Sequence, residues 1–337
     1  MFKKILSGIL DGHKLSTEEA KALMNYMMKG ELTESQISAI LIALKMRGET
    51  PEEISGFVLA MREHAVRVAV DSYAIDTCGT GGDGKNTFNI STLVAIIASA
   101  GGVPVLKHGN KSVSSKSGSA DVLREIGFDI EMTREEAEEC FKQNDMAFLF
   151  APNYHKSMKN VAGVRGELGI RTVFNILGPL INPAEVKGQV LGVFDPKLTG
   201  IMADVLKRTG TERAMIVHGS DGLDEITITG KTIVSELKDG EIINYEIDPR
   251  DYGIAFSPIE SVVGGEAAEN AGIMRSVLSG EQGPKRDIVL LNSAAALYIG
   301  KAAKDFGEGI EFAREIIDSG AAMEKLEKLI KYSGGLR

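Results

Sequence analysis

The sequence is poor in cysteine and in long hydrophobic runs. Its 337 residues include only two cysteines, Cys78 and Cys140, which is too few for a disulfide framework or a structural zinc site and fits a reducing cytosol. The longest nearly apolar stretch, residues 93–106, is interrupted by two glycines and a proline and is shorter than the roughly 18 residues of a membrane span. The apolar run after Lys3 and Lys4 is too short for a secretory signal. We therefore expect a cytoplasmic protein with no membrane partner.

Positive charge is also scarce. Lys and Arg total 38 residues against 47 Asp and Glu, which gives a formal net charge of −9. Nucleic acids and anionic membranes attract proteins with a positive field, so neither is an expected partner. Any phosphate that the protein binds must be held by a local site. Glycine, in contrast, is abundant at 38 residues, and many glycines lie between Gly79 and Gly118.

Residues 1–69 are predicted to form a small helical domain. A Ser or Thr followed three residues later by Glu or Gln satisfies free N–H groups at the start of a helix. Apolar residues also recur at helical spacing, as at Ile37, Ile40, Leu41 and Leu44, so the helices can pack as a bundle. The capping pairs are Ser16 with Glu19, Thr33 with Gln36, and Thr50 with Glu53.

Residues 70–337 are predicted to form a large α/β domain, because short apolar strands alternate with helices. This alternation predicts a mostly parallel central sheet. A second group of strand-like segments, with Asp239 and Gly240 as a tight hairpin turn, predicts an antiparallel extension at one end of the sheet. The expected parallel strands are 74–76, 103–107, 146–150, 189–193, 213–218 and 288–291; the extension is 226–229, 232–238 and 241–247; the helices are 91–100, 120–126, 134–144 and 200–209.

A glycine-rich loop, residues 78–87, follows an expected strand and precedes an expected helix. Its glycines permit tight turns and expose backbone N–H groups to an anion at the start of the helix. The loop therefore indicates phosphate binding. The alternative is a glycine turn that only packing requires.

Two phosphate-binding patterns match this loop incompletely. Gly79, Gly81 and Gly84 fit the dinucleotide pattern, but the acidic residue expected about 20 positions later is absent. Gly79, Gly84 and Lys85 fit most of a P-loop, but Asn86 stands where a Ser or Thr would meet Mg²⁺. Neither a dinucleotide-binding fold nor a P-loop NTPase is favoured.

Two further segments can supply groups that bind the same anion. Residues 89–92 place side-chain oxygens and N–H groups at an expected helix start, where they also have a simple explanation as helix caps. Residues 107–119 contain three lysines and five serines and follow another strand. A basic run is often a solvated surface, and His108 alone is typical of a structural histidine. However, the carboxyl ends of neighbouring parallel strands meet at one edge of a sheet, which favours a second anion-binding loop.

Adjacent carboxylates, Asp224 and Glu225, follow the expected strand 213–218. Oxygen ligands of this kind suit Mg²⁺, often through water. The alternative is an exposed acidic loop. With two anion-binding loops expected nearby, a Mg²⁺ ion that bridges a pyrophosphate accounts for all three segments.

Residues 76–83, 107–119, 175–183 and 221–225 resemble the four signature segments of the anthranilate phosphoribosyltransferase family, in the same order. The third of these segments indicates, by itself, only a helix end followed by a turn. The resemblance implies a pentosyltransferase that moves the phosphoribosyl group of 5-phosphoribosyl 1-pyrophosphate to the amine of anthranilate, in the second step of tryptophan biosynthesis from chorismate. It also implies that a segment near 165–185 joins the helical domain, that the substrates meet between the domains, that Mg²⁺ is required, and that homodimers form through the helical domains.

The resemblance further implies the site residues, none of them a covalent nucleophile. The implied metal ligands are Ser91, Asp224 and Glu225, and the implied anthranilate contacts are Gly79, Asn110 and Arg165; a surface ion pair is the alternative role for Arg165. The implied contacts to 5-phosphoribosyl 1-pyrophosphate are Gly79, Gly82, Asp83, Thr87, Asn89, Ile90, Ser91, Thr92, Lys107, His108, Gly109, Asn110, Lys111, Ser112, Val113, Ser114, Ser115 and Ser119. The family frequently has Arg-Ala or Arg-Ser where this chain has Lys111 and Ser112.

Two other functions remain as alternatives. A pyrimidine nucleoside phosphorylase has the same fold, but its loops differ from residues 107–110 and metal-free phosphorolysis gives Asp224 and Glu225 no role. A nucleotide-binding module without catalysis is suggested only by the dinucleotide pattern. It would bind nucleotide without Mg²⁺ and show no turnover.

Overall fold

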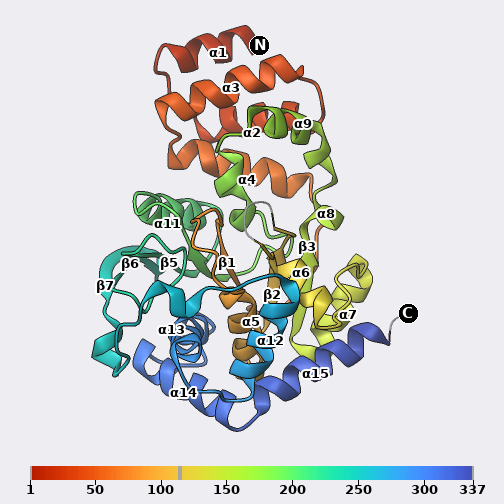
Figure 1. The fold of residues 1–337 in the computed structure, drawn as a ribbon. Helices are drawn as coiled ribbons and strands as arrows, with labels where there is room; N and C mark the ends of the chain where they lie inside the picture. The colour runs from red at the N-terminus through yellow and green to blue at the C-terminus, as the bar shows by residue number, and fades with distance from the viewer. Residues whose placement is uncertain (1, 113–115, 336–337) are drawn as a thin grey trace.

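The computed structural model describes residues 2–112 and 116–335 (Figure 1). Val113, Ser114 and Ser115, which the family resemblance assigns to the donor loop, lie outside the described residues. Within the described ranges, no helix is long and apolar enough to cross a membrane.

The N-terminal part is the expected helical bundle, drawn in red and orange at the top of Figure 1. In all three predicted capping boxes the hydroxyl accepts a backbone N–H while the residue three positions later accepts the N–H of the cap. Side chains from residues 161–181 share the core of this bundle, so a distant segment of the chain completes it. The helices are α1 (Phe2–Leu10), α2 (Thr17–Met28), α3 (Glu34–Arg47) and α4 (Pro51–Glu63), joined by α9 (Lys159–Leu168) and α10 (Phe174–Leu177).

A seven-stranded sheet forms the centre of the remaining chain, in the order β3-β2-β1-β4-β5-β6-β7. The first five strands in this order are parallel, and β6 and β7 extend the sheet in antiparallel pairing, as the sequence predicts. Asp239 and Gly240, between β6 and β7, both have positive φ, which suits a tight hairpin turn. The strands are β1 (Ile75–Gly79), β2 (Val105–Gly109), β3 (Met146–Phe150), β4 (Gly188–Gly192), β5 (Arg213–Gly219), β6 (Thr232–Lys238) and β7 (Glu241–Ile247).

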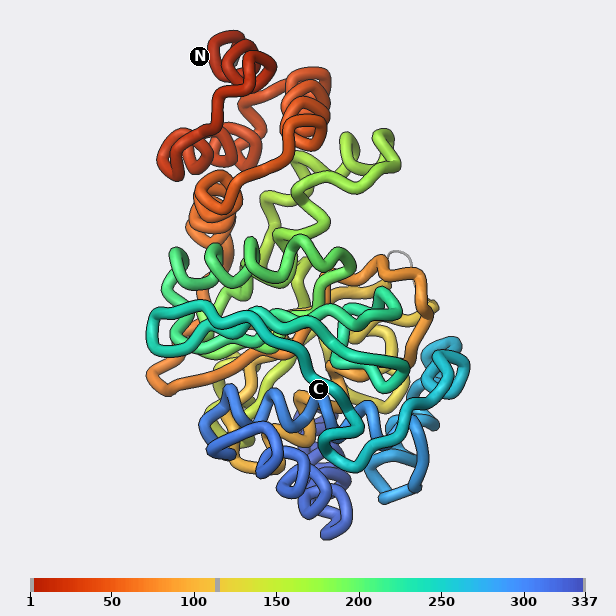
Figure 2. Tube along the Cα trace, turned by 90° about the vertical axis from the view of Figure 1, so that its left-hand side faces the viewer, coloured from red at the N-terminus to blue at the C-terminus, as the bar shows by residue number. Residues whose placement is uncertain are grey.

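Helices cover both faces of the sheet, which therefore lies between two hydrophobic cores. The helical bundle and α11 lie on one side, and the C-terminal helices lie on the other (Figure 2). The remaining helices are α5 (Ile90–Ala100), α6 (Ser119–Glu125), α7 (Arg134–Asn144), α8 (Ala151–Tyr154), α11 (Leu198–Arg208), α12 (Ala267–Leu278), α13 (Pro284–Ile299), α14 (Phe306–Asp318) and α15 (Ala321–Gly334), with short 3₁₀ turns at Lys156–Met158, Gly178–Leu180, Pro249–Tyr252 and Ile259–Val262.

Two of the expected strands are wrong. Residues 288–291 lie inside α13, whose side chains are buried almost all round, and such a fully buried apolar run has no periodicity that separates helix from strand. Residues 226–229 form no strand, because Asp221 accepts hydrogen bonds from the hydroxyls of Thr227 and Thr229, at 2.9 and 2.7 Å, and bends the segment.

Candidate active site

Three loops leave the same edge of the sheet, after β1, β2 and β5. Strand β4 lies between β1 and β5 in the sheet, so the loop after β5 must cross over its end to reach the glycine-rich loop. The crossing is very close: a Cβ atom at Gly192, the last residue of β4, would lie 1.5 Å from the carbonyl oxygen of Asp224. Glycine at this position therefore lets the two outer loops meet.

The loop after β5, which carries Asp224 and Glu225 and which we call the carboxylate loop, is in direct contact with the glycine-rich loop. The N–H of Gly81 donates to Asp224 Oδ2 at 2.7 Å, and a Cβ atom at Gly79 would lie 2.4 Å from that oxygen. Tight packing does require a glycine at position 79, which is the alternative stated above for this loop. The packing partner, however, is a carboxylate at the predicted metal site, so the packing role and the site role coincide.

Three carboxyl groups gather where these loops meet. Burial, and then the neighbouring Asp83, raise the pKa of Asp224 to about 7. Burial and the adjacent Asp224 raise the pKa of Glu225 well above its usual range. Asp83 Oδ2 is buried without a hydrogen-bond partner among the described residues. The three carboxyl groups repel one another, but within the described residues no group of three or more Asp, Glu, His or Cys side chains is arranged to hold a metal ion.

Lys107 is almost fully buried beneath this cluster, at 2% exposure. Its ammonium group donates to the carbonyl oxygen of Thr77 and, at 3.1 Å, to Ser91 Oγ. The N–H of Ser91, in the first turn of α5, also donates to Glu225. Burial lowers the pKa of Lys107, while the carboxyl groups of Asp76 and Glu225 partly offset this effect. The predicted residues Lys107, Ser91 and Glu225 are thus brought together.

The start of α5 is held by groups other than its predicted cap. Asn89 makes no capping hydrogen bond; its Nδ2 donates to the carbonyl oxygen of Ser117 at 3.1 Å, and its Oδ1 accepts from Asn270 Nδ2 at 3.0 Å. Asn89 therefore connects the start of α5 to the second loop and to α12, and the interpretation as a simple helix cap is wrong for it. Thr87 forms an isolated bridge with Val263, while Ile90 and Thr92 are buried in α5.

The second anion-binding loop predicted above, within residues 107–119, follows β2, and its described part is folded against the start of α6. Asp121 accepts the N–H groups of Ser112 and Gly118, at 3.0 and 2.9 Å. Ser119 donates its hydroxyl to the carbonyl oxygen of Asn110 at 3.3 Å, and a Cβ atom at Gly109 would lie 2.4 Å from that Ser119 hydroxyl. Lys111, like Asn110, is exposed. The described part of the loop therefore has a defined conformation, with the side chains of Asn110, Lys111 and Lys116 exposed.

Two histidines lie at the base of the second loop. The ring centroids of His108 and His155 are 5.1 Å apart, in an edge-to-face arrangement. The carbonyl oxygens of Gly178 and Ile181 accept hydrogen bonds from His108 and His155, respectively, and the Nε2 atom of each ring is buried without a described partner. Burial lowers the pKa of His155 to about 4 and that of His108 well below its usual range, so both rings are neutral at pH 7.

The third signature segment, residues 175–183, is fastened mainly through its backbone. We call it the strap. Besides the two histidine contacts, the carbonyl oxygen of Pro179 accepts from Gln189 at 2.7 Å, and that of Leu180 accepts from the buried Arg62 at 2.8 Å. Asn182 Nδ2 donates to Asp76 Oδ2 at 2.9 Å. The strap thus connects the helical bundle to β1, β2 and β4, a role that its sequence alone did not indicate.

Arg165 lies on α9, in the helical bundle (Figure 1). Its guanidinium group lies above the ring of Phe174, at 5.4 Å from the centroid, and burial lowers its pKa. It forms no ion pair with any described residue, so the surface ion pair suggested as its alternative role is not found in the described ranges. No hydrogen bond between described residues connects its side chain to the three loops.

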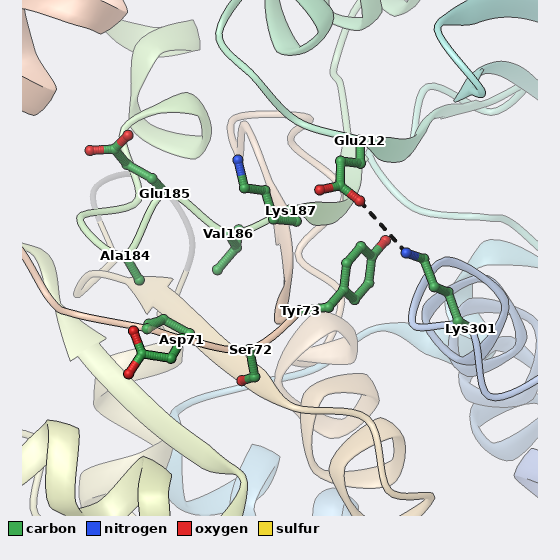
Figure 3. Close-up of a pocket in the computed structure, with 10 residues that line it drawn as sticks. Asp71, Ser72, Tyr73, Ala184, Glu185, Val186, Lys187, Glu212 and Lys301 are labelled. Atoms are coloured by element: carbon green, nitrogen blue, oxygen red, sulfur yellow. Dashed lines mark ion pairs between the residues drawn. The ribbon is translucent and has the colours of Figure 1, made fainter.

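A cavity of about 380 Å³ lies at the opposite edge of the sheet, where β1 and β4 begin (Figure 3). Lys301 partly closes it: its ammonium group is 3.6 Å from Glu212 and lies over the ring of Tyr73. Because the carboxyl edge carries the loops, the buried carboxylates and Lys107, this cavity is separate from the candidate active site.

Sequence reasoning missed several residues that shape the site. Asn270 contacts Asn89, and Gly264 packs so closely on Phe88 that a Cβ atom would lie 2.6 Å from its backbone. Arg171 reaches the glycine-rich loop. The adjacent glycines 264 and 265 were the only available signal, because single polar residues far from a motif have no characteristic spacing.

Comparison with known proteins identifies the family. Residues 71–323 match the model of the glycosyl transferase family a/b domain, and residues 3–65 match its helical bundle domain. An anthranilate phosphoribosyltransferase of Thermoanaerobacter sp. (strain X514) is 58% identical over 333 residues, which cover 98% of each chain. One of Acetivibrio thermocellus is 53% identical over 99% of this chain and 97% of that protein.

Solved structures agree with this assignment. Anthranilate phosphoribosyltransferase from Thermus thermophilus has a TM-score of 0.92 and 42% sequence identity, over 97% of this chain and 98% of that one. The Saccharomyces cerevisiae enzyme in complex with PRPP and Mg has a TM-score of 0.91 and 30% identity, over 99% and 98% of the two chains. The chain belongs to the anthranilate phosphoribosyltransferase family.

Proposed function

We propose that this chain transfers the phosphoribosyl group of 5-phosphoribosyl 1-pyrophosphate to the amine of anthranilate at the carboxyl edge of its sheet. The products are N-(5-phosphoribosyl)anthranilate and pyrophosphate. The observation that carries the proposal is the meeting of the glycine-rich loop, the buried Lys107 and the adjacent carboxylates Asp224 and Glu225 in one place. An anion and a cation are both needed to balance these charges, and a metal-bound pyrophosphate group supplies both.

The donor site is proposed to consist of the glycine-rich loop, the start of α5 and the second loop. The positive end of the α5 dipole and the ammonium of Lys107 favour a pyrophosphate. The hydrogen bonds of the buried Lys107 ammonium group go to neutral oxygens, and the carboxyl groups of Asp76 and Glu225 lie near it, so a phosphate oxygen of the donor would add to the negative charge that already faces this ammonium group. The described members of the proposed donor site are Gly79, Gly82, Asp83, Thr87, Asn89, Ile90, Ser91, Thr92, Lys107, His108, Gly109, Asn110, Lys111, Ser112 and Ser119.

Magnesium is proposed to bind Asp224, Glu225 and Ser91 Oγ. The buried Asp83 Oδ2 without a described partner, and the raised pKa of Asp224 beside it, fit a cation at this position. Mg²⁺ is usually held by one or two carboxylates together with substrate phosphates and water, which matches this set. When bound, the ion would neutralise charge on the departing pyrophosphate.

Anthranilate is proposed to meet Gly79, Asn110 and Arg165. Arg165 can pair with the substrate carboxylate through two parallel hydrogen bonds, since no described residue occupies its guanidinium in an ion pair. Asn110, exposed at the end of β2, can orient the amine. The aromatic amine is neutral at pH 7, so the protein must position it rather than deprotonate it.

The chemistry requires no covalent nucleophile. Loss of pyrophosphate leaves positive charge on the sugar and negative charge on the leaving group. Lys107 and the backbone N–H groups of the loops are placed to stabilise that negative charge, and one such donor is typically worth about 10²–10³ in rate. The neutral side chains of His108 and His155 add no competing charge at pH 7.

The domain boundaries, the oligomeric state and the location are also proposals. Residues 1–69 and 165–185 are taken as one domain, because side chains of residues 161–181 pack with the helical bundle, in a core to which β4, β5 and α11 also contribute; residues 70–337 otherwise form the other domain. A homodimer through the helical domain is supported by Leu10 and Met46, which are 68% and 84% exposed on α1 and α3. Two buried free cysteines are consistent with a cytoplasmic protein. Light scattering of wild-type protein and of Met46→Glu tests the dimer.

The decisive test of function is the loss of anthranilate fluorescence on mixing with purified protein, donor and Mg²⁺. The chain has no tryptophan to obscure the signal. We expect loss only with donor and metal, and much slower loss with the double variant Asp224→Asn/Glu225→Gln. The control Glu324→Gln/Glu327→Gln removes two charges from exposed positions on α15 and is expected to act like wild type. Persistent fluorescence with folded, metal-replete wild type contradicts the proposal and favours phosphorolysis of pyrimidine nucleosides.

A further inference from the structure

The turn after α9 reaches across to the glycine-rich loop. Arg171, three residues beyond the end of α9, donates a hydrogen bond from Nη2 to the carbonyl oxygen of Gly82. Its guanidinium group also lies over the ring of Phe194, 4.3 Å from the centroid. Arg171 has no carboxylate partner within the described ranges, so its charge is directed at the loop.

Both contacts of Arg171 act on the same loop. The N–H of Phe194 donates to Thr80 Oγ1 at 3.2 Å, and the N–H of Thr80 donates to the carbonyl oxygen of Gly192 at 2.9 Å. Arg171 therefore contacts the loop directly at Gly82 and indirectly, through Phe194, at Thr80. In this stretch from Thr80 to Gly82, Gly81 has a positive φ of 66° and Gly82 a positive φ of 76°. Consecutive glycines have many accessible conformations, and a cation on one carbonyl oxygen favours a single one.

Arg171 is itself held in a fixed relation to α9. Gly169 ends the helix with a positive φ of 59°, and the N–H of Thr172 donates to Asn175 Oδ1 at 2.9 Å. Asn175 is the first residue of the strap. The short turn thus begins at the glycine that ends α9 and is held to the strap directly after Arg171. Only two residues separate the end of α9 from Arg171, so a movement of α9, which carries Arg165, is transmitted to Arg171 over a short distance.

We propose that Arg171 is a positioning residue that couples the acceptor site to the donor site. The inference rests on the proposed function, in which Arg165 holds anthranilate and the glycine-rich loop holds the pyrophosphate group. When anthranilate engages Arg165, α9 is held in place, Arg171 keeps Gly82 and Phe194 in position, and the loop conformation that accepts pyrophosphate is favoured. By thermodynamic linkage, pyrophosphate must strengthen the binding of anthranilate by the same factor.

The test compares three variants with wild type. Arg171→Met removes both contacts, and Arg171→Lys retains the charge without the planar stacking. The control is Arg250→Met, because Arg250, in the 3₁₀ turn Pro249–Tyr252, also lies over a phenylalanine ring, Phe256, at 4.4 Å; this variant additionally removes an exposed ion pair with Asp248. The readouts are the KM for 5-phosphoribosyl 1-pyrophosphate, kcat at saturation, and the Kd of anthranilate measured by its own fluorescence with and without Mg²⁺ and pyrophosphate.

We expect Arg171→Met to raise the donor KM about tenfold, the effect of losing one hydrogen bond from a charged group. We expect kcat at saturation to change far less, because Arg171 touches no reacting atom. In wild type, pyrophosphate with Mg²⁺ should tighten anthranilate binding, and in Arg171→Met this factor should fall towards one. Arg171→Lys should lie between the two, and Arg250→Met should match wild type.

Several outcomes overturn the inference. One is a folded Arg171→Met protein with unchanged donor KM and unchanged coupling, and another is wild type without any coupling between the two ligands. Should Arg171→Met fail to fold, Phe194→Leu, which removes only the stacking partner, must reduce the coupling in the same direction. If wild type binds anthranilate and pyrophosphate but does not consume anthranilate, the proposed function fails, while calorimetry with pyrophosphate still reports whether Arg171 shapes the glycine-rich loop.

Discussion

The end of β4 and the carboxylate loop are closer than any side chain at that strand end permits: a Cβ atom at Gly192 would lie 1.5 Å from the carbonyl oxygen of Asp224. Gly192→Ala must therefore displace Asp224. We expect the free energy of unfolding to fall by about 1–3 kcal/mol, the usual cost of overpacking, and Mg²⁺-dependent activity to be largely lost. Denaturant unfolding and the fluorescence assay measure the two effects.

The control for this prediction is Gly200→Ala. Gly200 lies in α11, where a Cβ atom would meet nothing within 4 Å, so alanine should stabilise the helix by up to about 1 kcal/mol and leave activity unchanged. Equal behaviour of the two variants would contradict the proposed contact between β4 and the carboxylate loop.

Lys107 should affect the rate more than the fold of the site. Lys107→Met keeps the buried aliphatic stem but removes the charge that faces Ser91 and the proposed pyrophosphate. We expect kcat to fall by about 10²–10³, the typical value of one preorganised donor to developing charge. Because Lys107 lowers the pKa of Asp76, which is about 6, that pKa should rise further. Single-turnover kinetics and NMR titration of Asp76 check the two parts; a kcat within threefold of wild type would remove Lys107 from the proposed mechanism.

Acid should destabilise the protein through His155. The unfolded chain binds a proton at this residue below its usual pKa of 6.5, whereas burial lowers the folded pKa to about 4. Between these values the unfolded state binds more protons, so stability falls as pH decreases, by about 3 kcal/mol in total. Asp76 acts in the opposite direction, because burial raises its pKa to about 6.

The variant His155→Phe isolates this contribution. Phe cannot titrate, and the effect of Asp76 is present in both proteins. Burial, the main cause that lowers the pKa of His108, also remains in the variant, whereas the smaller contribution of a charged His155 to that pKa is removed. Between pH 7 and pH 4, wild type should therefore lose about 3 kcal/mol more unfolding free energy than the variant. Parallel stability curves across that range would show that His155 becomes protonated in the folded state.

Arg62 is expected to hold the strap in place. It is buried and donates to the carbonyl oxygens of Leu180 and Thr209. Arg62→Met leaves these carbonyls without a partner and should lower the unfolding free energy by about 2–4 kcal/mol. Arg67→Met, which removes an exposed ion pair with Glu185, should cost less than about 1 kcal/mol. Urea unfolding of the two variants compares them directly, and a similar loss in both would argue against the strap contact.

Local signals predicted much of the architecture. The helix 134–144 and the strand 146–150 occur at the predicted residues, because Thr133 and Glu136 form a capping box and a short apolar run follows directly. The strand predicted at residues 288–291, which lie in α13, was wrong because complete burial removes the alternation of apolar and polar residues that identifies a strand or helix face. The pattern of neighbouring residues predicts an element well when the element depends mainly on local interactions, as the helix 134–144 and the strand 146–150 do.

The candidate site was predictable only where its groups occur in a run. Asp224 and Glu225 are adjacent, and the glycines of residues 79–84 are clustered, so both loops were identified. Arg171 and Asn270 act across long sequence separations, to Gly82 and Asn89. Their roles depend on how the two parts of the chain dock, which no spacing within either part records.

The strap also determines where the sequence is free to change. Its contacts with His108, His155, Arg62 and Gln189 are made through carbonyl oxygens, which every residue type possesses. The side chains of Leu180 and Ile181 can therefore be exchanged for others of similar volume without losing a single one of these hydrogen bonds. These four contacts depend on their donors, so a substitution in a donor should be more damaging than one at Leu180 or Ile181. Asn182 is an exception within the strap, because its own side chain donates to Asp76.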